Sequence, residues 1–318
     1  MVEKKKKSTG EIFADLSMPI LLLILIVVFS IMSKNFLTPL NITNILVQNV
    51  HVAIVATAVM IIMISGGCDL SIGYQMSVAA VLVAKMISVY NIPVVVSVLC
   101  GIALCSALGT FNGFMALKLK SNTMIVTLGT MAIFQGISFL ISGSKTYHNL
   151  PKPFMMIGQG KIFGWLPINV LIMVVLVVAA GFVMGKTAVG RKVYAAGDNP
   201  EAARLAGLNV AKIKVLSFTV AGILVGVAAV LLTSRSGSAD SGTGVGIEFT
   251  GITACVLSGV ALKGGEGTLW KVIVAVYALG VLANGMQLIN LGAYPQYIAK
   301  GIIMLASLYI TNRNAKGL

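Results

Sequence analysis

The sequence predicts an all-α membrane protein, a polytopic bundle of about ten transmembrane helices. Hydrophobic residues make up 58% of the 318 residues and charged residues only 10%, whereas soluble domains are about 45–50% apolar. The apolar residues also gather into runs long enough to cross a bilayer as a helix, which takes about 20 residues. Because lipid cannot satisfy unpaired backbone groups, these runs should be helical. The alternating pattern of a membrane barrel is absent from the sequence.

We expect one transmembrane domain over residues 1–318, with an N-terminal tail at 1–16, a long loop at 186–214 and a C-terminal tail at 312–318. The lysines Lys4 to Lys7 precede an apolar run without a small-residue cleavage site, so the first span is expected to stay uncleaved. The ten expected spans lie at roughly 17–34, 46–66, 71–89, 93–116, 123–142, 166–185, 213–233, 250–263, 268–289 and 295–311.

The excess of positive charge predicts how the chain is oriented. Lys and Arg together number 23, and the formal net charge is +14. With the N-terminus in the cytoplasm, most of these residues fall on the cytoplasmic side of the spans, which is the bias that membrane proteins show. We therefore expect both termini and the 186–214 loop in the cytoplasm. The basic residues should contact anionic membrane lipid rather than nucleic acid.

A short polar helix is predicted within this loop, in the stretch GDNPEAARLAG from Gly197 to Gly207. Asn199 suits the N-cap, Pro200 the first helical position and Glu201 the first turn. Gly207 is placed to end the helix. A helix this short is not stable alone in water, so it must pack on something. It is either a connector that lies on the protein's own bundle or a docking helix for a soluble partner.

The segment Glu201-Ala202-Ala203 followed by Gly207 resembles the EAA-x3-G signature of ABC importer permeases. In that family the loop forms the coupling helix, which sits in a cleft of the ATP-binding subunit. Other segments, in the family's order and over nearly the whole chain, are similar to the ribose-type monosaccharide permeases. These segments are GGCDLSIG (66–73), NGF at Asn112, IVTLGTMAIFQG (125–136), TAVGRKVYAAGDNPEAARLAGLNVAKIK (187–214), LSGVALKGGEGT (257–268) and LANGMQLINLG (282–292).

The resemblance implies a type II ABC importer-like permease of the bacterial inner membrane, with no enzyme activity or cofactor of its own. Its implied partners are a second permease subunit, identical or different, two modules that bind ATP and Mg²⁺, and an extracytoplasmic solute-binding protein. The implied substrate is a ribose-like monosaccharide. A nucleoside, a polyol or a furanosyl signal molecule are alternatives, because Cys68 and the segment Glu248 to Gly251 depart from the family pattern. The residues implied to couple to the ATPase are Asn199, Pro200, Glu201, Ala202, Ala203, Arg204 and Gly207.

Asp69 is the one acidic residue expected at membrane depth. A charge in the bilayer centre is costly, so such a residue often has a function, structural or in gating. Alternatively, Asp69 caps the helix expected to start near Ser71. If it bound a proton or sodium ion, the chain could be an ion-coupled secondary transporter, which is the alternative from a different class of mechanism.

Seven polar side chains within the spans are candidates to line a hydrophilic pathway. Amide groups can exchange hydrogen bonds with sugar hydroxyls, but the same groups can also bond neighbouring helices to one another. The candidates are Asn49, Gln75, Asn112, Thr127, Gln135, Asn284 and Gln287.

Motifs for nucleotide hydrolysis and metal binding are not recognisable. The segment from Gly181 to Thr187 resembles a phosphate-binding loop, but its spacer is one residue too short. His51 and His148 lie far apart in the expected topology and do not form a metal site. The energy for transport must therefore come from a partner or from an ion gradient.

Overall fold

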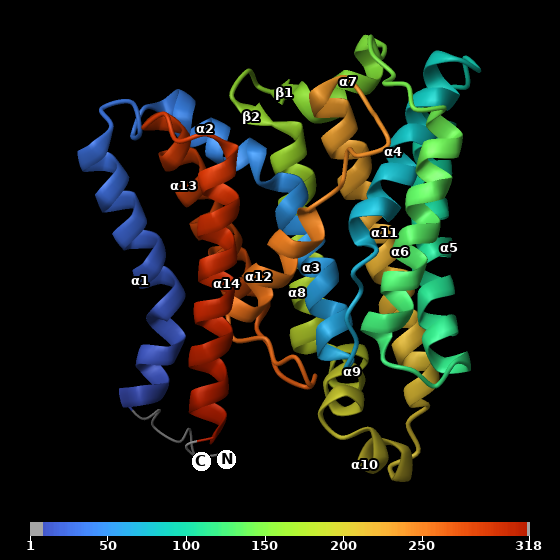
Figure 1. Ribbon diagram of the computed structural model, residues 1–318, viewed down its shortest axis with the longest axis vertical. Coiled ribbons are helices and arrows are strands. Elements are labelled where there is room, and N and C mark those ends of the chain that lie inside the picture. The colour runs from blue at the N-terminus through green and yellow to red at the C-terminus, as the bar shows by residue number, and fades with distance from the viewer. Residues whose placement is uncertain (1–8, 317–318) are drawn as a thin grey trace.

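The computed structural model describes the backbone of residues 9–316 and the side chains of residues 16–306. Most of the helices run along one common direction and form a bundle, which confirms the all-α prediction (Figure 1). The helices are α1 (Thr9–Met32), α2 (Pro39–Gln48), α3 (Val50–Ile64), α4 (Ile72–Ser88), α5 (Val94–Lys118), α6 (Thr123–Ser142), α7 (Lys152–Gln159), α8 (Ile168–Lys186), α9 (Ala188–Asp198), α10 (Pro200–Leu205), α11 (Val210–Ser236), α12 (Ile247–Leu257), α13 (Leu269–Leu288) and α14 (Ala293–Lys316). The strands β1 (Lys161–Ile162) and β2 (Leu166–Pro167) form a small antiparallel hairpin.

Six helical segments are long and apolar enough to cross a membrane: α2 with α3, α5, α6, α8, α11 and α13. Three apolar segments are shorter, namely Leu16–Met32 of α1, α4 and α12. Together with α14, they occupy the ten positions at which the sequence predicts spans. The order of the apolar helices therefore follows the sequence prediction, and the structure is compatible with a count of about ten spans.

The boundaries expected for the eighth of these spans, 250–263, are wrong. Helix α12 has 11 residues and ends at Leu257, which gives a length of about 16 Å at 1.5 Å per residue. The chain then turns at Gly259, whose φ is +83°, a conformation that glycine adopts at no steric cost. The following residues form a loop up to α13 because Gly264, Gly265 and Gly267 also have positive φ.

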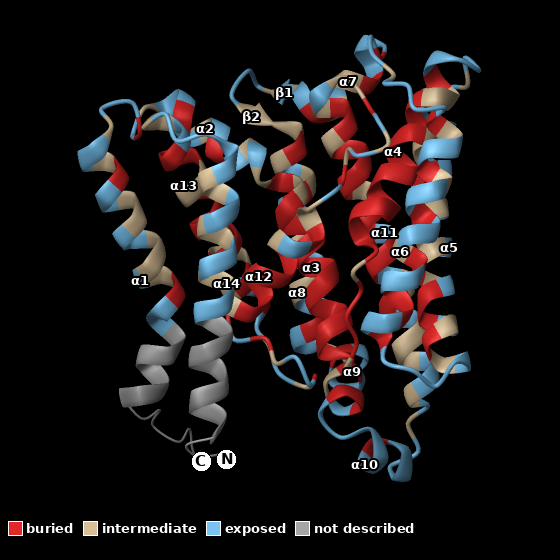
Figure 2. Cartoon of the chain, in the orientation of Figure 1, coloured by how far each residue is buried: buried red, intermediate tan, exposed pale blue. Residues whose placement is uncertain are grey.

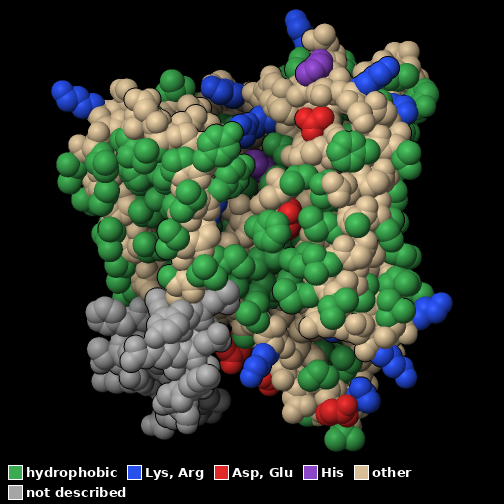
Figure 3. Space-filling model, viewed as in Figure 1, with side chains coloured by type: hydrophobic (Ala, Val, Ile, Leu, Met, Phe, Trp, Pro, Cys, Tyr) green, Lys and Arg blue, Asp and Glu red, His purple; other side chains and the backbone are tan. Residues whose placement is uncertain are grey.

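The bundle has two distinct ends. The start of α1, the end of α14, the α5–α6 loop and helices α9 and α10 lie at one end, which we call the α10 end (Figure 1). Helices α2 and α7 and the β1–β2 hairpin lie at the opposite end. Charged side chains gather near these two ends, and few lie between them on the face shown in Figure 3. This distribution suits a molecule whose middle lies in lipid.

Helix α3 forms the centre of the core. Every residue of α3 except His51 is buried, as expected for a helix that is apolar on all sides. It packs against α8, α11, α12 and α13, and the densest burial lies around it (Figure 2). Large apolar side chains on α1, α5, α6 and α8 are exposed, among them Leu23, Leu99, Leu140 and Val178, so these helices face lipid or another subunit.

Candidate functional site

Helix α10 is capped at both ends by the residues that the sequence predicts. The side-chain oxygen of Asn199 accepts a hydrogen bond from the N–H of Ala202 at 2.9 Å, which satisfies a donor of the first turn. Gly207 adopts a φ of +82°, and the N–H of Leu208 returns to the carbonyl of Ala203 at 3.0 Å. This is the C-terminal closure that glycine favours. The helix ends at Leu205, one residue earlier than expected.

The surface of α10 is largely free of contacts with the rest of the chain. The helix extends beyond the other helices at its end of the bundle (Figure 1) and touches α9 and α11. Ala203 is buried against the protein, whereas Leu205 is 89% exposed. Glu201 and Arg204 form an exposed ion pair at 3.5 Å, a kind of pair that contributes little to stability. Helix α10 thus offers an apolar side chain outward, at a site where burial would require another protein.

Helix α9 connects α10 to the core of the bundle. Asn199 is both the residue after α9 and the N-cap of α10, so the two helices meet at a single residue. Gly197, near the end of α9, lies against the carbonyl of Ile64 at the end of α3, and a Cβ at Gly197 would clash with that oxygen. Residues 188–198 therefore link the exposed helix directly to the buried one.

A third segment, the loop between α12 and α13, completes this contact. The N–H of Gly265 donates to the carbonyl of Ile64 at 2.9 Å. A Cβ at Gly264 would lie 2.9 Å from the carbonyl oxygen of Gly197 and 2.9 Å from the backbone nitrogen of Gly66. We call these four residues, Gly66, Gly197, Gly264 and Gly265, the glycine junction. At Gly197, Gly264 and Gly265 a Cβ would clash with the backbone of a neighbouring segment, so close approach requires glycine there. Gly66 has room for a Cβ but adopts a φ of +76°, a conformation that favours glycine.

The buried Asp69 lies just beyond this junction, in the break between α3 and α4. Its carboxylate is 3% exposed. One oxygen accepts the N–H of Ser71 at 2.8 Å and its hydroxyl at 2.6 Å, and the other accepts the amides of Gln75 at 2.9 Å and Asn112 at 3.1 Å. The N-cap of α4 is Ser71, so Asp69 binds the N-cap residue and is not itself the cap.

Helix α6 holds the same break from the other side. The hydroxyl of Thr123 accepts the N–H of Cys68 at 2.9 Å, and the hydroxyl of Thr127 accepts the N–H of Leu70 at 3.1 Å. Irregular backbone at membrane depth is tolerated where protein groups satisfy it. The irregular segment at residues 65–71 is therefore held in place by specific hydrogen bonds, which connect it to α4, α5 and α6.

The seven pathway candidates do not converge on one channel within the chain. Gln75, Asn112 and Thr127 surround the Asp69 break. Asn284 exchanges two hydrogen bonds of 2.9 Å with Asn41, and the amide of Asn49 donates to the carbonyl of Ile45 at 2.7 Å. Gln135 and Gln287 are exposed at the surface of the chain. The buried and partly buried candidates thus form bonds within the bundle, although the Oδ1 of Asn112 has no partner among the described residues, and their role in a pathway stays a prediction.

Sequence reasoning missed several residues of this region. Ser71 and Thr123 complete the break, and each could have been found from its spacing, because Ser71 lies within GGCDLSIG and Thr123 is four residues before Thr127. Glu248 is also buried, accepts the N–H of Gly246 at 3.1 Å and lies against Gly73 of α4. The four residues of the glycine junction lie within segments that carry the family resemblance, but their contact could not be predicted because the three segments are remote in sequence.

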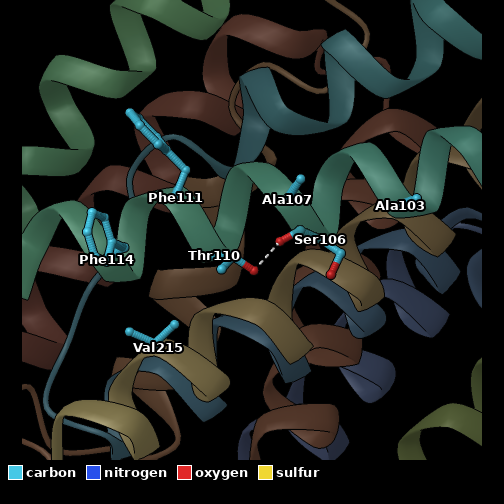
Figure 4. Close-up of a pocket in the computed structure, with 7 residues that line it drawn as sticks. All are labelled: Ala103, Ser106, Ala107, Thr110, Phe111, Phe114 and Val215. Atoms are coloured by element: carbon cyan, nitrogen blue, oxygen red, sulfur yellow. Dashed lines mark hydrogen bonds between the residues drawn. The ribbon is translucent and has the colours of Figure 1, made fainter.

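A groove of about 610 Å³ lies between α5 and α11 (Figure 4). Small side chains form much of its wall. The hydroxyl of Thr110 donates to the carbonyl of Ser106 at 2.7 Å and lies 2.8 Å from the hydroxyl of Thr219. The lining residues are Ala103, Ser106, Ala107, Thr110, Phe111, Phe114 and Val215. Most of these side chains are apolar, so the groove offers few polar groups to a sugar.

The apolar bundle and its exposed, capped helix define a multi-pass membrane protein with a projecting helix at one end. Residues 41–309 match the family described as the branched-chain amino acid transport system permease component, and the chain belongs to that family. It is 33% identical over 305 residues to the L-arabinose transport system permease protein AraH of Escherichia coli, covering 96% of this chain and 92% of the relative. It is 32% identical over 296 residues to the ribose import permease protein RbsC of Bacillus subtilis, covering 92% and 91%. No solved structure matches.

Proposed function

We propose that the chain is the membrane-spanning permease subunit of an ATP-driven importer for a monosaccharide. The observation that carries this proposal is its similarity, over nine-tenths of both chains, to permeases named for L-arabinose and ribose. The projecting helix α10, with both of its caps in place, supports the same function. A permease that has no ATPase of its own needs an exposed surface to which a separate ATPase subunit binds. A nucleoside, a polyol or a furanosyl signal molecule are the alternative substrates.

The proposed complex contains this permease, a second permease subunit, two ATP-binding modules and an extracytoplasmic solute-binding protein. ATP and Mg²⁺ bind to the modules, and this chain holds no cofactor. The α10 end and both termini lie on the cytoplasmic side of the bacterial inner membrane. Each module receives α10, with Leu205 as the apolar contact and Glu201 and Arg204 at its rim. An exposed leucine flanked by charged side chains suits an interface whose centre is apolar and whose edge is polar.

The glycine junction supplies the route from α10 to the membrane interior. A displacement of α10 moves α9 through their shared residue Asn199. Because Gly197 contacts the end of α3 and the loop before α13, α9 cannot shift without moving these segments. The end of α3 leads into the break that Asp69 holds. We infer that closure of the ATP-binding modules reaches the bundle along this path as a rigid-body movement.

Asp69 itself supports the ATP-driven mechanism over an ion-coupled one. Its two oxygens already accept four hydrogen bonds from Ser71, Gln75 and Asn112. A sodium site would need several of these oxygen lone pairs free. The saturated carboxylate suits a structural role at the break instead.

Co-purification tests the proposal. A P-loop ATPase should copurify with the tagged permease from its native membrane, and Leu205→Asp should release it because the substitution places a charge in the apolar contact. The control is Leu119→Asp, which alters an exposed leucine in the α5–α6 loop at the same end. Uptake of labelled ribose or L-arabinose should persist when an uncoupler is added at constant ATP. Uptake that collapses with the uncoupler, or a permease free of ATPase in mild detergent, would contradict the proposal.

A further inference from the structure

A second cavity, of about 540 Å³, lies at the α10 end between α8, α9 and α11. Its walls are apolar and follow helical spacing: Leu176, Ala180 and Val183 line it from α8, and Leu216 and Val220 from α11. Val183, Leu216 and Val220 are each at least 40% exposed, so the cavity opens outward on the side of the bundle. Its volume is that of a ligand site, typically about 300–1,000 Å³.

Two lysines are among the residues that line the cavity at the α10 end. Lys192 of α9 and Lys212 of α11 both line it, and both are exposed. Among the residues that the structure describes, neither lysine forms an ion pair. Lys212 also lies in the first turn of α11, which Asn209 caps, so the positive end of a long helix adds to the charge of the two ammonium groups.

We propose that this cavity binds an anionic phospholipid, with one acyl chain between α8 and α11 and the phosphate between Lys192 and Lys212. The apolar walls of the cavity, which form a slot, suit an acyl chain. The two lysines at its mouth suit a negatively charged headgroup. The outer face of α8 carries exposed Val175, Val178 and Phe182, so a lipid whose acyl chain entered the slot would lie beside further apolar surface. A soluble phosphate compound would fill the mouth and leave the apolar slot empty.

The location gives the bound lipid a structural consequence. Gly207, Leu208 and Asn209, which connect α10 to α11, also line the cavity. A phosphate held by Lys192 and Lys212 would therefore bridge α9 to the start of α11. Because α10 lies between these two helices in the chain, the bound phosphate would restrict how α10 moves. This inference concerns lipid binding alone and stands independently of the transported substrate.

Lipid retention tests the proposal directly. The purified permease, in its native oligomeric state, is equilibrated in nanodiscs of phosphatidylcholine in which about one lipid in five is phosphatidylglycerol. Native mass spectrometry then identifies the lipids that stay bound after delipidation. We expect phosphatidylglycerol to be enriched over its share of the bilayer. Each lysine near an anionic headgroup strengthens binding by about fivefold, so Lys192→Gln with Lys212→Gln should weaken retention by about 25-fold.

Two control variants make the result specific. Lys118→Gln with Lys120→Gln removes the same charge at the same end of the bundle and should leave retention unchanged. Ala180→Trp fills the slot without altering charge and should also abolish retention, whereas Val178→Trp, on the outer face of α8, should not. Equal retention of the two lipids by the unaltered protein would overturn the proposal. So would an equal loss in the Lys118 and Lys120 variant, or retention that survives Ala180→Trp, since the mouth alone would then suffice.

Discussion

At the scale of single residues, Asp69 shows how a charged group is accommodated inside an apolar bundle. A buried carboxylate is tolerated where hydrogen-bond donors replace water. Asp69 receives two such donors from Ser71, one from Gln75 and one from Asn112. Those donors come from the break, from α4 and from α5, so the carboxylate ties three separate segments to one point. Its contribution is to fix the geometry of the break.

Asp69→Asn should destabilise the protein although it changes one atom of the side chain. The new amide nitrogen would face the amide donors of Gln75 and Asn112, leaving a buried donor without an acceptor, which costs about 1–3 kcal/mol. We expect a lower melting temperature in detergent and reduced uptake. The matched control is Asp240→Asn in the exposed loop before α12, where an asparagine oxygen can still accept the N–H of Gly242 that Asp240 accepts at 2.7 Å. Equal melting temperatures for both variants would contradict this role of Asp69.

At the scale of elements, α9 and α10 are joined directly, because Asn199 both follows α9 and caps α10. Helix α10 contacts little besides α9 and α11, and α9 is held to the core at two points. Gly197 lies against the end of α3, and the hydroxyl of Tyr194 donates to the carbonyl of Gly267 at 2.7 Å. Six residues alone would not form a stable helix. The stability of α10 therefore depends on its caps and on α9.

Gly197→Ala should uncouple the ATPase from transport while leaving its docking site intact. The added methyl group would clash with the carbonyl of Ile64, and relief of such overpacking costs about 1–3 kcal/mol. Because the glycine junction would open, we expect uptake to fall by about tenfold or more, while the ATPase still copurifies. The control is Gly185→Ala in α8, where no atom lies within 4 Å of the added carbon. Unchanged uptake in Gly197→Ala would show that the junction does not transmit the movement.

The elements differ in how far the sequence could predict them. Helix α10 was predictable with its caps because Asn199, Pro200 and Gly207 act within a few residues of one another. The glycine junction was not, because Gly66, Gly197 and Gly264 meet only after the chain has folded. The span expected at 250–263 failed for a related reason: hydropathy counts Val260, Ala261 and Leu262 as apolar, but the positive-φ glycines around them determine a loop.

At the scale of the whole molecule, the bundle of apolar helices was predictable and the pathway was not. Transfer of apolar runs into lipid is a property of each run, so length and composition suffice. Polarity alone could not separate a pathway from helix packing: Asn284 pairs with Asn41, whereas Gln135 remains exposed. The surface of α6 near Gln135 also leaves open space at Gly129 and Gly136, where no atom lies within 4 Å of an added Cβ.

This exposed face of α6 predicts where a second copy of the permease packs. A polar amide midway along a 20-residue apolar helix is costly in lipid, and flanking glycines allow a second helix to approach closely. In a Cys100→Ser background, which removes the exposed native cysteine, Gln135→Cys should give cross-linked dimers with a short bis-maleimide in native membranes. Val178→Cys, on the 64% exposed outer face of α8, should remain monomeric under the same conditions. If Gln135→Cys gives no dimer, or if both variants cross-link equally, α6 does not pair with a second copy and its exposed amide faces a different subunit.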